Sequence, residues 1–435
     1  MAGEWETVRV QDIAKRTATG PFGSAISSKH FLDSGVPVIR GSNLSQIVST
    51  RLDDSGLVFV SEEKAQEFRR SEVRRGDLVF TCWGTIDQVG LIDDRAKHDR
   101  YIVSNKQMLL TPDATRADSL FLYYYFASPD VRALIINQGI GSSVPGFNLG
   151  QLRSFEIPLP PLTEQKAIAA VLGALDDKIE CNRRMNATLE AMARALFQSW
   201  FVDFDPVRAK VDGRTPAHLD PATAALFPDS LQESGDGHIP KGWTAQRLPD
   251  AIEVNPRRTL KSGTIAPYLD MKNLPTQGHS AEEVIDREFN SGTKFRNGDT
   301  LLARITPCLE NGKTGYVDFL EDGQVGWGST EYIVLAPKSP LPPQFGYLLA
   351  RSDALRAHAI QNMTGTSGRQ RVPAECFSTF WLAVATPEIA RRFDELTAPL
   401  MAKIKSNSTE SRTLAALRDA LLPRLLSGEL RVAGG

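Results

Sequence analysis

The stretch LTEQKAIAAVLGALDDKIECNRRMNATLEAMARALFQSW, residues 162–200, decides the fold. Positions that lie alternately four and three residues apart, from Ile168 to Trp200, are apolar except for Asn182 and Asn186. This spacing is typical of the seam along which one long helix packs against another. The stretch therefore predicts a long helix that has a helical partner.

The partner is predicted in the stretch TPEIARRFDELTAPLMAKIKSNSTESRTLAALRDALL, which begins at Thr386. Its seam is weaker, and Asn407 and Ser411 interrupt it about 225 residues after Asn182 and Asn186. If the helices pair antiparallel, Asn182 faces the region of Ser411 and Asn186 that of Asn407. Such a polar layer would fix the register of the pair. The alternative is that these residues rotate toward solvent.

Both predicted helices begin with residues that are typical of a helix N-terminus. Thr163 and Thr386 are suitable N-caps, and acidic residues follow each of them in the first turn. We assign residues 158–204 and 386–430 to the two helices.

The remainder of the chain contains a duplication. WETVRVQDIA from Trp5 is echoed by WTAQRLPDAI from Trp243, and VRRGDLVF around Asp77 matches FRNGDTLLA around Asp299. In both VRRGDLVF and FRNGDTLLA a polar turn leads into an apolar strand. Later, LFLYYYFASPDVRALI and QFGYLLARSDALRAHAI have helical spacing and lead into the small-residue loops GSSVPGFN and GTSGRQRV.

The duplication predicts the domain organisation. Residues 1–157 and 241–385 form two globular domains, and the proline-rich segment 205–240 is an ordered or semi-ordered linker. The predicted fold is α/β, with two pseudo-symmetric mixed α/β domains separated by a long antiparallel two-helix coiled coil.

Composition restricts the class of protein. With 41% hydrophobic and 23% charged residues, the 435-residue chain is an ordinary globular protein. It has no apolar run of about 18 residues and no signal peptide, so we expect a cytoplasmic protein without membrane contact. The four cysteines and six histidines lack ligand spacing, which predicts no bound metal.

Signatures of catalysis are missing from the sequence. The string NGKT at 311–314 resembles the end of a phosphate-binding loop, but that motif requires glycine at position 307, where this chain has proline. No GxGxxG motif opens a helix, and no Asn-Pro-Pro-aromatic string of adenine methyltransferases is present. We predict no catalytic residue and no cofactor bound by this chain.

Several stretches resemble the specificity subunits of type I restriction-modification systems. FEIPLPPLTEQKAIAAVLGALDDKIE from Phe155 and LAALRDALLPRLLSGEL from Leu414 are similar to the two helical regions of that family. ARITPCLENGK from Ala303 and GTSGRQRVP from Gly365 are similar to phrases of its target recognition domains. The resemblance extends over essentially the whole chain.

The resemblance implies a non-catalytic DNA-binding function. Each target recognition domain would read one half of a bipartite site in double-stranded DNA. The helices would dock methyltransferase subunits that methylate adenine, and the assembly would recruit motor-nuclease subunits. S-adenosylmethionine, ATP and Mg would belong to these partner subunits.

Candidate DNA contacts lie in loops rich in Arg, Asn, Gln and Ser. Arginine can donate two hydrogen bonds to guanine, and Asn or Gln can pair in the same way with adenine. The candidates are Arg40, Ser42, Asn43, Trp83, Thr85, Ser142, Ser143, Asn148, Lys272, Asn273, Arg304, Ser367, Arg369, Gln370 and Arg371. The alternative for each is packing, capping or turning the chain. The loop tips differ between the two copies, which indicates two different half-sites.

The net charge of -2 is unusual for a protein that binds nucleic acid alone. It is consistent with partner subunits that supply much of the contact to phosphates. Two other functions stay open, namely a stand-alone DNA-modifying enzyme with an unrecognised motif and a coiled-coil scaffold.

Overall fold

The computed structural model describes residues 5–23, 25–140, 145–235, 237–366 and 368–432. The chain divides into two compact units, Met1–Glu180 with Ser411–Gly435 and Cys181–Glu410. The long helices α5 (Leu162–Phe197) and α11 (Pro387–Leu426) contribute residues to both units. Each unit therefore combines one globular head with part of each long helix.

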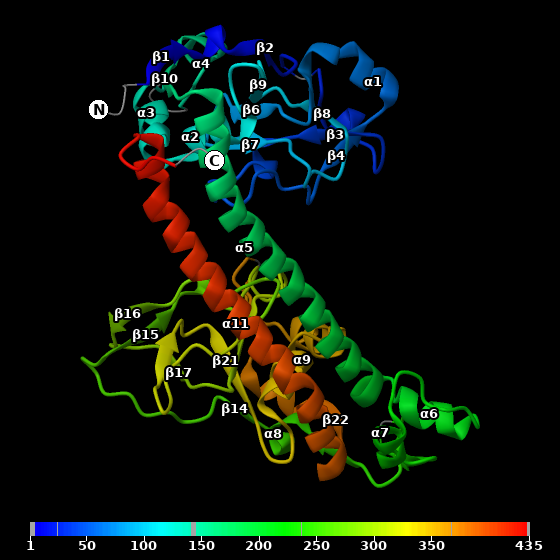
Figure 1. Ribbon diagram of the computed structural model, residues 1–435. Helices are drawn as coiled ribbons and strands as arrows, with labels where there is room; N and C mark the ends of the chain where they lie inside the picture. Colours follow the sequence, from blue (N-terminus) through cyan, green and yellow to red (C-terminus); the bar gives the residue numbers. More distant parts are fainter. Residues whose placement is uncertain (1–4, 24, 141–144, 236, 367, 433–435) are drawn as a thin grey trace. The chain divides into compact units, whose positions relative to one another are not determined.

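The head of the first unit is coloured blue to cyan in Figure 1. Its strands are β1 (Glu6–Arg9), β2 (Ala14–Thr19), β3 (Val36–Ile39), β4 (Val58–Val60), β5 (Glu72–Arg74), β6 (Leu78–Thr81), β7 (Val89–Leu91), β8 (Arg100–Val103), β9 (Gln107–Pro112) and β10 (Glu156–Leu159). Its helices are α1 (Glu62–Glu67), α2 (Ser119–Ala127), α3 (Pro129–Asn137) and α4 (Leu149–Ser154).

The second unit begins at Cys181 within α5 and continues through the segment between the halves into the second head. Its strands are β11 (Leu231–Ser234), β12 (Gly237–Pro240), β13 (Thr244–Arg247), β14 (Ile252–Val254), β15 (Ile265–Leu269), β16 (Ile285–Glu288), β17 (Thr293–Phe295), β18 (Thr300–Ala303), β19 (Thr314–Tyr316), β20 (Gly326–Gly328), β21 (Tyr332–Pro337) and β22 (Trp381–Val384). Its helices are α6 (Asp205–Val211), α7 (Pro221–Leu226), α8 (Leu248–Ala251), α9 (Pro343–Ala350) and α10 (Asp353–Gln361).

The two heads have the same sheet topology. One four-stranded sheet has the order β2-β9-β6-β7 in the first head and β14-β21-β18-β19 in the second. The other has the order β4-β3-β8-β5 and β16-β15-β20-β17, with the parallel pairs β3/β8 and β15/β20 at matching places. The predicted duplication of a mixed α/β domain is confirmed.

The matched Gly-Asp turns are built in the same way. The Asp77 carboxylate accepts a hydrogen bond from Arg16 Nη2 at 3.3 Å, and Asp299 accepts one from Arg258 Nη2 at 2.9 Å. Burial raises the pKa of both aspartates, while the hydrogen bonds from the arginines act in the opposite direction. Each glycine before the aspartate has a positive φ, which only glycine adopts readily.

The helical stretch after the sheets differs from the sequence prediction. The sequence predicted helical spacing there without a division, and the structure has two helices in each head: α2 and α3, separated at Ser128, and α9 and α10, separated near Ser352. Both serines hydrogen-bond local backbone groups, which favours a helix end. α2 is buried on all sides from Phe121 onward. The start of α5 also differs, because Leu162 precedes Thr163 in the helix.

The long helices run antiparallel and their polar layer is internal. Asn407 Nδ2 donates to Asn186 Oδ1 at 2.9 Å, Asn186 Nδ2 donates to Ser408 Oγ at 3.2 Å, and Asn182 Nδ2 donates to Glu410 Oε2 at 2.8 Å. Asn182 and Asn407 are buried rather than turned toward solvent. Ser411, the fourth predicted member, is half-buried and belongs to the first unit. Its role in the register stays a prediction.

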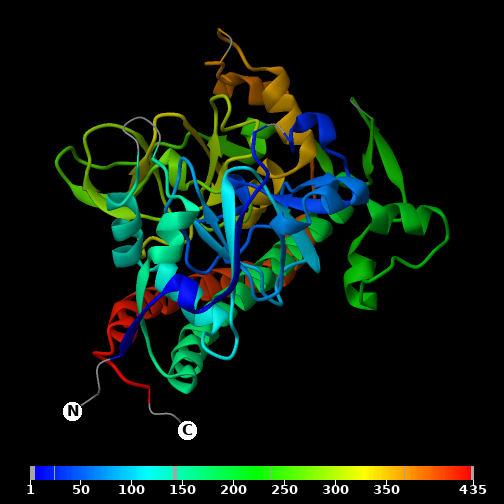
Figure 2. The same cartoon turned by 90° about the horizontal axis from the view of Figure 1, so that it is seen from above.

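The segment between the halves is ordered where the structure describes it. α6 and α7, drawn in green in Figure 2, lie at the margin of the second unit. Phe204, Val207 and Phe227 pack into the same apolar core as Trp243. The segment is therefore anchored to the second head.

Candidate nucleic-acid interface

The loop that carries the strongest candidates is attached to the same frame in both heads. Phe147 N donates to Cys82 O at 2.9 Å in the first head, and Val372 N donates to Arg304 O at 2.8 Å in the second. These bonds place the loop beside the end of β6 in the first head and of β18 in the second. Isolated bridges join Trp83 to Gly146 and Ile305 to Arg371, so these are equivalent positions. We call the two loop bases, 82–85 with 145–148 and 304–307 with 368–372, the first tip and the second tip.

The second tip is cationic, and one of its arginines forms an ion pair with Glu331 that the sequence did not reveal. Arg371 Nη2 lies 2.6 Å from Glu331 Oε1, and Arg371 Nε lies 2.9 Å and 3.0 Å from the two carboxylate oxygens of Glu331. The hydrogen bonds to Glu331 raise the pKa of Arg371. Glu331 precedes β21, so it reaches the loop from a distant part of the sequence.

The other candidates of the second tip have different surroundings. Arg369 is exposed, and Gln370 is half-buried with its backbone bonded to Thr306. Arg304 is half-buried, and its Nε has no hydrogen bond to the residues that the structure describes. Ser367 lies outside the described residues. The three arginines and the single Glu331 carboxylate leave the second tip positively charged.

The first tip is aromatic. The Trp83 side chain is exposed and packs on Gly146, while Thr85 is exposed. Asn148 Oδ1 accepts from Gln151 N at 3.0 Å, so Asn148 is the N-cap of α4. Ser142 and Ser143 lie outside the described residues. The two tips thus share a backbone frame and differ in side-chain chemistry.

Gly146→Ala is expected to disturb the first tip. A Cβ at position 146 would lie 2.4 Å from Trp83 Cζ3, so the indole must shift, at a cost of about 1 kcal/mol because it faces solvent. Urea unfolding would measure the loss. Gly235→Ala, where a Cβ meets open space, is the control, and Trp83→Ala in the same chain should relieve the loss. An equal loss in both glycine variants would contradict the steric explanation.

The candidates on the turns after β3 and β15 have local structural contacts. Asn43 is buried, and its Nδ2 donates to the carbonyls of Asp53 and Ser55. Arg40 Nη2 donates to Gly56 O at 2.8 Å, and Ser42 is exposed. In the second head, Asn273 Nδ2 donates to Glu283 at 3.3 Å and Lys272 is exposed. Ser42 and Lys272 are accessible, whereas Asn43 holds a loop.

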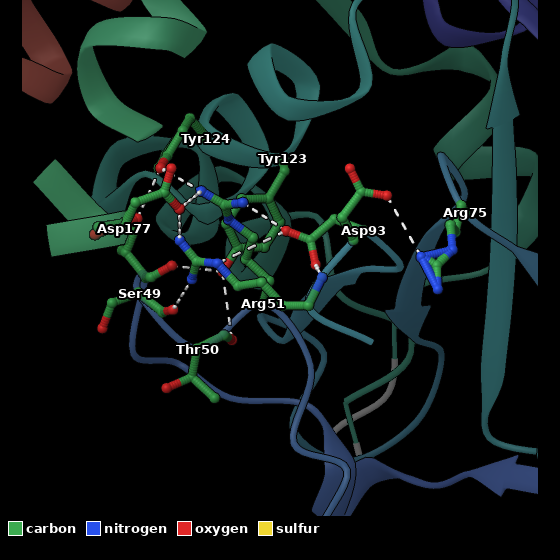
Figure 3. Close-up of polar contacts among 12 residues, drawn as sticks. Ser49, Thr50, Arg51, Arg75, Asp93, Tyr123, Tyr124 and Asp177 are labelled. Atoms are coloured by element: carbon green, nitrogen blue, oxygen red, sulfur yellow. Dashed lines mark hydrogen bonds and ion pairs between the residues drawn. The ribbon is translucent and has the colours of Figure 1, made fainter. Parts of the chain in front are cut away.

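The first unit contains a polar network that sequence reasoning missed. Figure 3 shows Arg51 with its partners Asp93 and Tyr124. Arg51 Nη1 donates to Asp93 Oδ2 at 2.5 Å, and Arg51 Nη2 donates to Tyr124 Oη at 3.3 Å. Tyr124 Oη donates to Asp176 Oδ2 at 2.7 Å, and Arg418 Nη1 donates to Asp176 Oδ1 at 2.8 Å. Burial by itself would lower the pKa of Arg51, but Tyr124 and Asp93 raise it overall. The network joins the head to α5 and α11 within this unit.

The described residues have neither a metal-binding cluster nor a helix that could cross a membrane. No group of three or more His, Cys, Asp or Glu side chains there is arranged to hold a metal ion. Among the helices that the structure describes, none has the length and apolarity needed to cross a membrane.

The fold defines a duplicated α/β protein in which each compact unit combines one head with part of each long helix, and the two heads have different tips. Residues 2–191 match the family model described as the type I restriction modification DNA specificity domain. The chain is also similar to solved and curated members of that family.

Two relatives match most of the chain. The type I restriction enzyme HindI specificity subunit of Haemophilus influenzae is 26% identical over 381 residues, 76% of this chain and 82% of that protein. The type I restriction enzyme MjaIX specificity subunit of Methanocaldococcus jannaschii is 23% identical over 441 residues, 99% of this chain and 94% of that protein. The crystal structure of a type I restriction-modification S subunit from M. genitalium superposes with a TM-score of 0.55 at 15% identity, covering 98% and 97% of the chains. Over these spans the chain is similar to the type I restriction-modification specificity subunits.

Proposed function

We propose that this chain is a non-catalytic specificity subunit and that each head reads one half of a split site in double-stranded DNA. The proposal is based on one observation: the two heads share the same backbone frame, but their tips carry different side chains. A pure scaffold has no need for such a difference. At equivalent positions the first head has Cys82, Trp83, Lys106 and Gly146, whereas the second has Arg304, Ile305, Glu331 and Arg371.

The long helices are the proposed docking surface for methyltransferase subunits. α5 carries the exposed apolar residues Val171, Met185 and Met192, and α11 carries Leu417. We propose that these side chains are buried when a partner docks. In the same proposal, motor-nuclease subunits join the assembly in the cytoplasm, and S-adenosylmethionine, ATP and Mg are bound by the partner subunits.

The net charge supports a dependence on partners. At -2 the chain has no overall excess of cations to neutralise phosphates, although the second tip is locally positive. We propose that partner subunits contribute much of the phosphate contact and that this chain supplies the choice of sequence.

Replacement of the second tip is expected to change only one half of the methylated motif. Cells would express this chain with the methyltransferase subunit of its system, and adenine methylation would be mapped across the genome. Wild type should give a split motif. Replacing residues 365–371 by a Gly-Ser loop should alter one half and keep the other, because the first head is untouched.

The control replaces the turn 321–324, which lies in the same head outside the tip, and should leave both halves intact. If methylation of no motif depends on this chain although the complex assembles, the specificity function is refuted and the scaffold is favoured. Binding of S-adenosylmethionine by the isolated chain would instead favour an unrecognised enzyme.

A further inference from the structure

We propose that Arg371 reads a guanine in the half-site of the second head and that Glu331 is the positioning residue that orients it. The inference rests on the proposed function and specifies one base contact within it. Four observations support it. Glu331 binds one edge of the Arg371 guanidinium, and the other edge is available. The backbone of both residues is held by hydrogen bonds, and the first head has no equivalent pair.

The Glu331 carboxylate occupies one edge of the Arg371 guanidinium. Nε lies 2.9 Å and 3.0 Å from the two carboxylate oxygens, and Nη2 lies 2.6 Å from Oε1. Two N–H groups that share one carboxylate hold a guanidinium in a defined plane. Arg371 is therefore restricted in rotation before any DNA arrives.

The opposite edge of the guanidinium is available. Nη1 has no hydrogen bond to any residue in the described part of the chain, and Nη2 retains a second hydrogen. The Arg371 side chain is 43% exposed. Nη1 and Nη2 together present two parallel donors, which is the pattern that guanine O6 and N7 accept in the major groove. Adenine presents a donor beside N7 and would oppose this edge.

The backbone of the pair is fixed at both ends. Arg371 N donates to Thr364 O at 2.8 Å and Thr364 N donates to Arg371 O at 2.9 Å. Glu331 O accepts from Arg304 N at 3.0 Å, and Glu331 N donates to Ser329 Oγ at 3.1 Å. An exposed ion pair adds little to folding stability, so its main consequence here is orientation. A pre-oriented side chain loses less conformational entropy on binding.

The first head lacks this device. The position equivalent to Arg371 is Gly146, and the position equivalent to Glu331 is Lys106, because Cys82 N donates to Lys106 O as Arg304 N donates to Glu331 O. Neither Gly146 nor Lys106 can form the pair. The guanine contact is thus specific to the half-site read by the second head.

The test is selection from a randomised DNA duplex library by the full chain in complex with its methyltransferase subunit. Wild type should select a split motif that contains a guanine in one half. Arg371→Ala should lower the preference for that guanine about tenfold while the other half keeps its sequence. Glu331→Gln should lower it less, because one amide oxygen can still accept from Nε. Arg369→Ala, which removes the same charge from the same loop, should weaken all sequences alike.

The outcomes separate the two proposals. If wild type selects no split motif, the proposed function fails and the guanine contact fails with it. If wild type selects a motif and Arg371→Ala weakens all sequences alike, Arg371 contacts phosphate and only the inference is overturned. If Arg371→Ala changes one guanine but Glu331→Gln does not, Glu331 has no positioning role. Unchanged thermal unfolding of each variant excludes loss of folding as the cause.

Discussion

Asp176→Ala is expected to destabilise the first unit by about 3 kcal/mol, because it removes the acceptor of a buried arginine. Asp176 is fully buried between Tyr124 Oη at 2.7 Å and Arg418 Nη1 at 2.8 Å. Arg418 is itself 5% exposed and, among the ion pairs of the described residues, would keep the one with Asp419. Urea unfolding, followed by hydrogen exchange of α2 and β6, would measure the loss.

The controls separate the buried charge from general damage. Asp176→Leu combined with Arg418→Met removes both charges and should recover part of the loss, the remainder being the cost of the buried Tyr124 hydroxyl that loses its acceptor. Glu429→Ala, which breaks the exposed pair with Arg424, should cost well under 1 kcal/mol. If the double variant is as unstable as Asp176→Ala, the loss of the buried partner of Arg418 is not the cause.

Arg351→Met is expected to cost about 3 kcal/mol in the second unit, since it removes charged donors from several carbonyls. Nη1 donates to Thr276 O at 2.6 Å and to Gly312 O at 2.9 Å. Nη2 donates to Gly278 O at 2.5 Å and to Thr314 O at 2.7 Å. One guanidinium therefore holds the segments 275–278 and 312–314 together. Faster hydrogen exchange in both segments should accompany the loss in urea unfolding.

Two comparisons test the explanation for Arg351. Arg351→Lys should recover less than half of the loss, because an ammonium cannot reproduce the planar set of donors. Arg194→Met should be nearly neutral, since Arg194 is exposed and makes one 3.5 Å contact with Arg351 O. An equal loss for Arg194→Met would indicate an effect of net charge rather than of these hydrogen bonds.

The fold was predictable where it depends on repeated local pattern. The seam from Ile168 to Trp200 and the paired Gly-Asp turns are local signals, and they gave the long helices and the duplication. The division of the later helices at Ser128 and Ser352 was missed, because a serine inside an apolar run is compatible with a continuous helix.

The candidate site was predictable only in part. Arg371 was selected as a candidate because it lies in a loop rich in polar residues, whereas Glu331 lies 40 positions earlier and meets it only in the folded head. Asp176 was missed for a related reason. An acidic residue on a long helix usually faces water, and nothing near it in sequence indicates Tyr124 or Arg418 as partners.

The division of the long helices between the units has a consequence for biosynthesis. The apolar core of the first unit includes Ile168 and Leu172 of α5 together with Leu422, Leu425 and Leu426 of α11. A ribosome delivers the first head and α5 long before it delivers these leucines. Until the last turns of α11 emerge, the nascent first unit has an uncovered apolar face, so completion of this core must wait until residues 422–426 have been made.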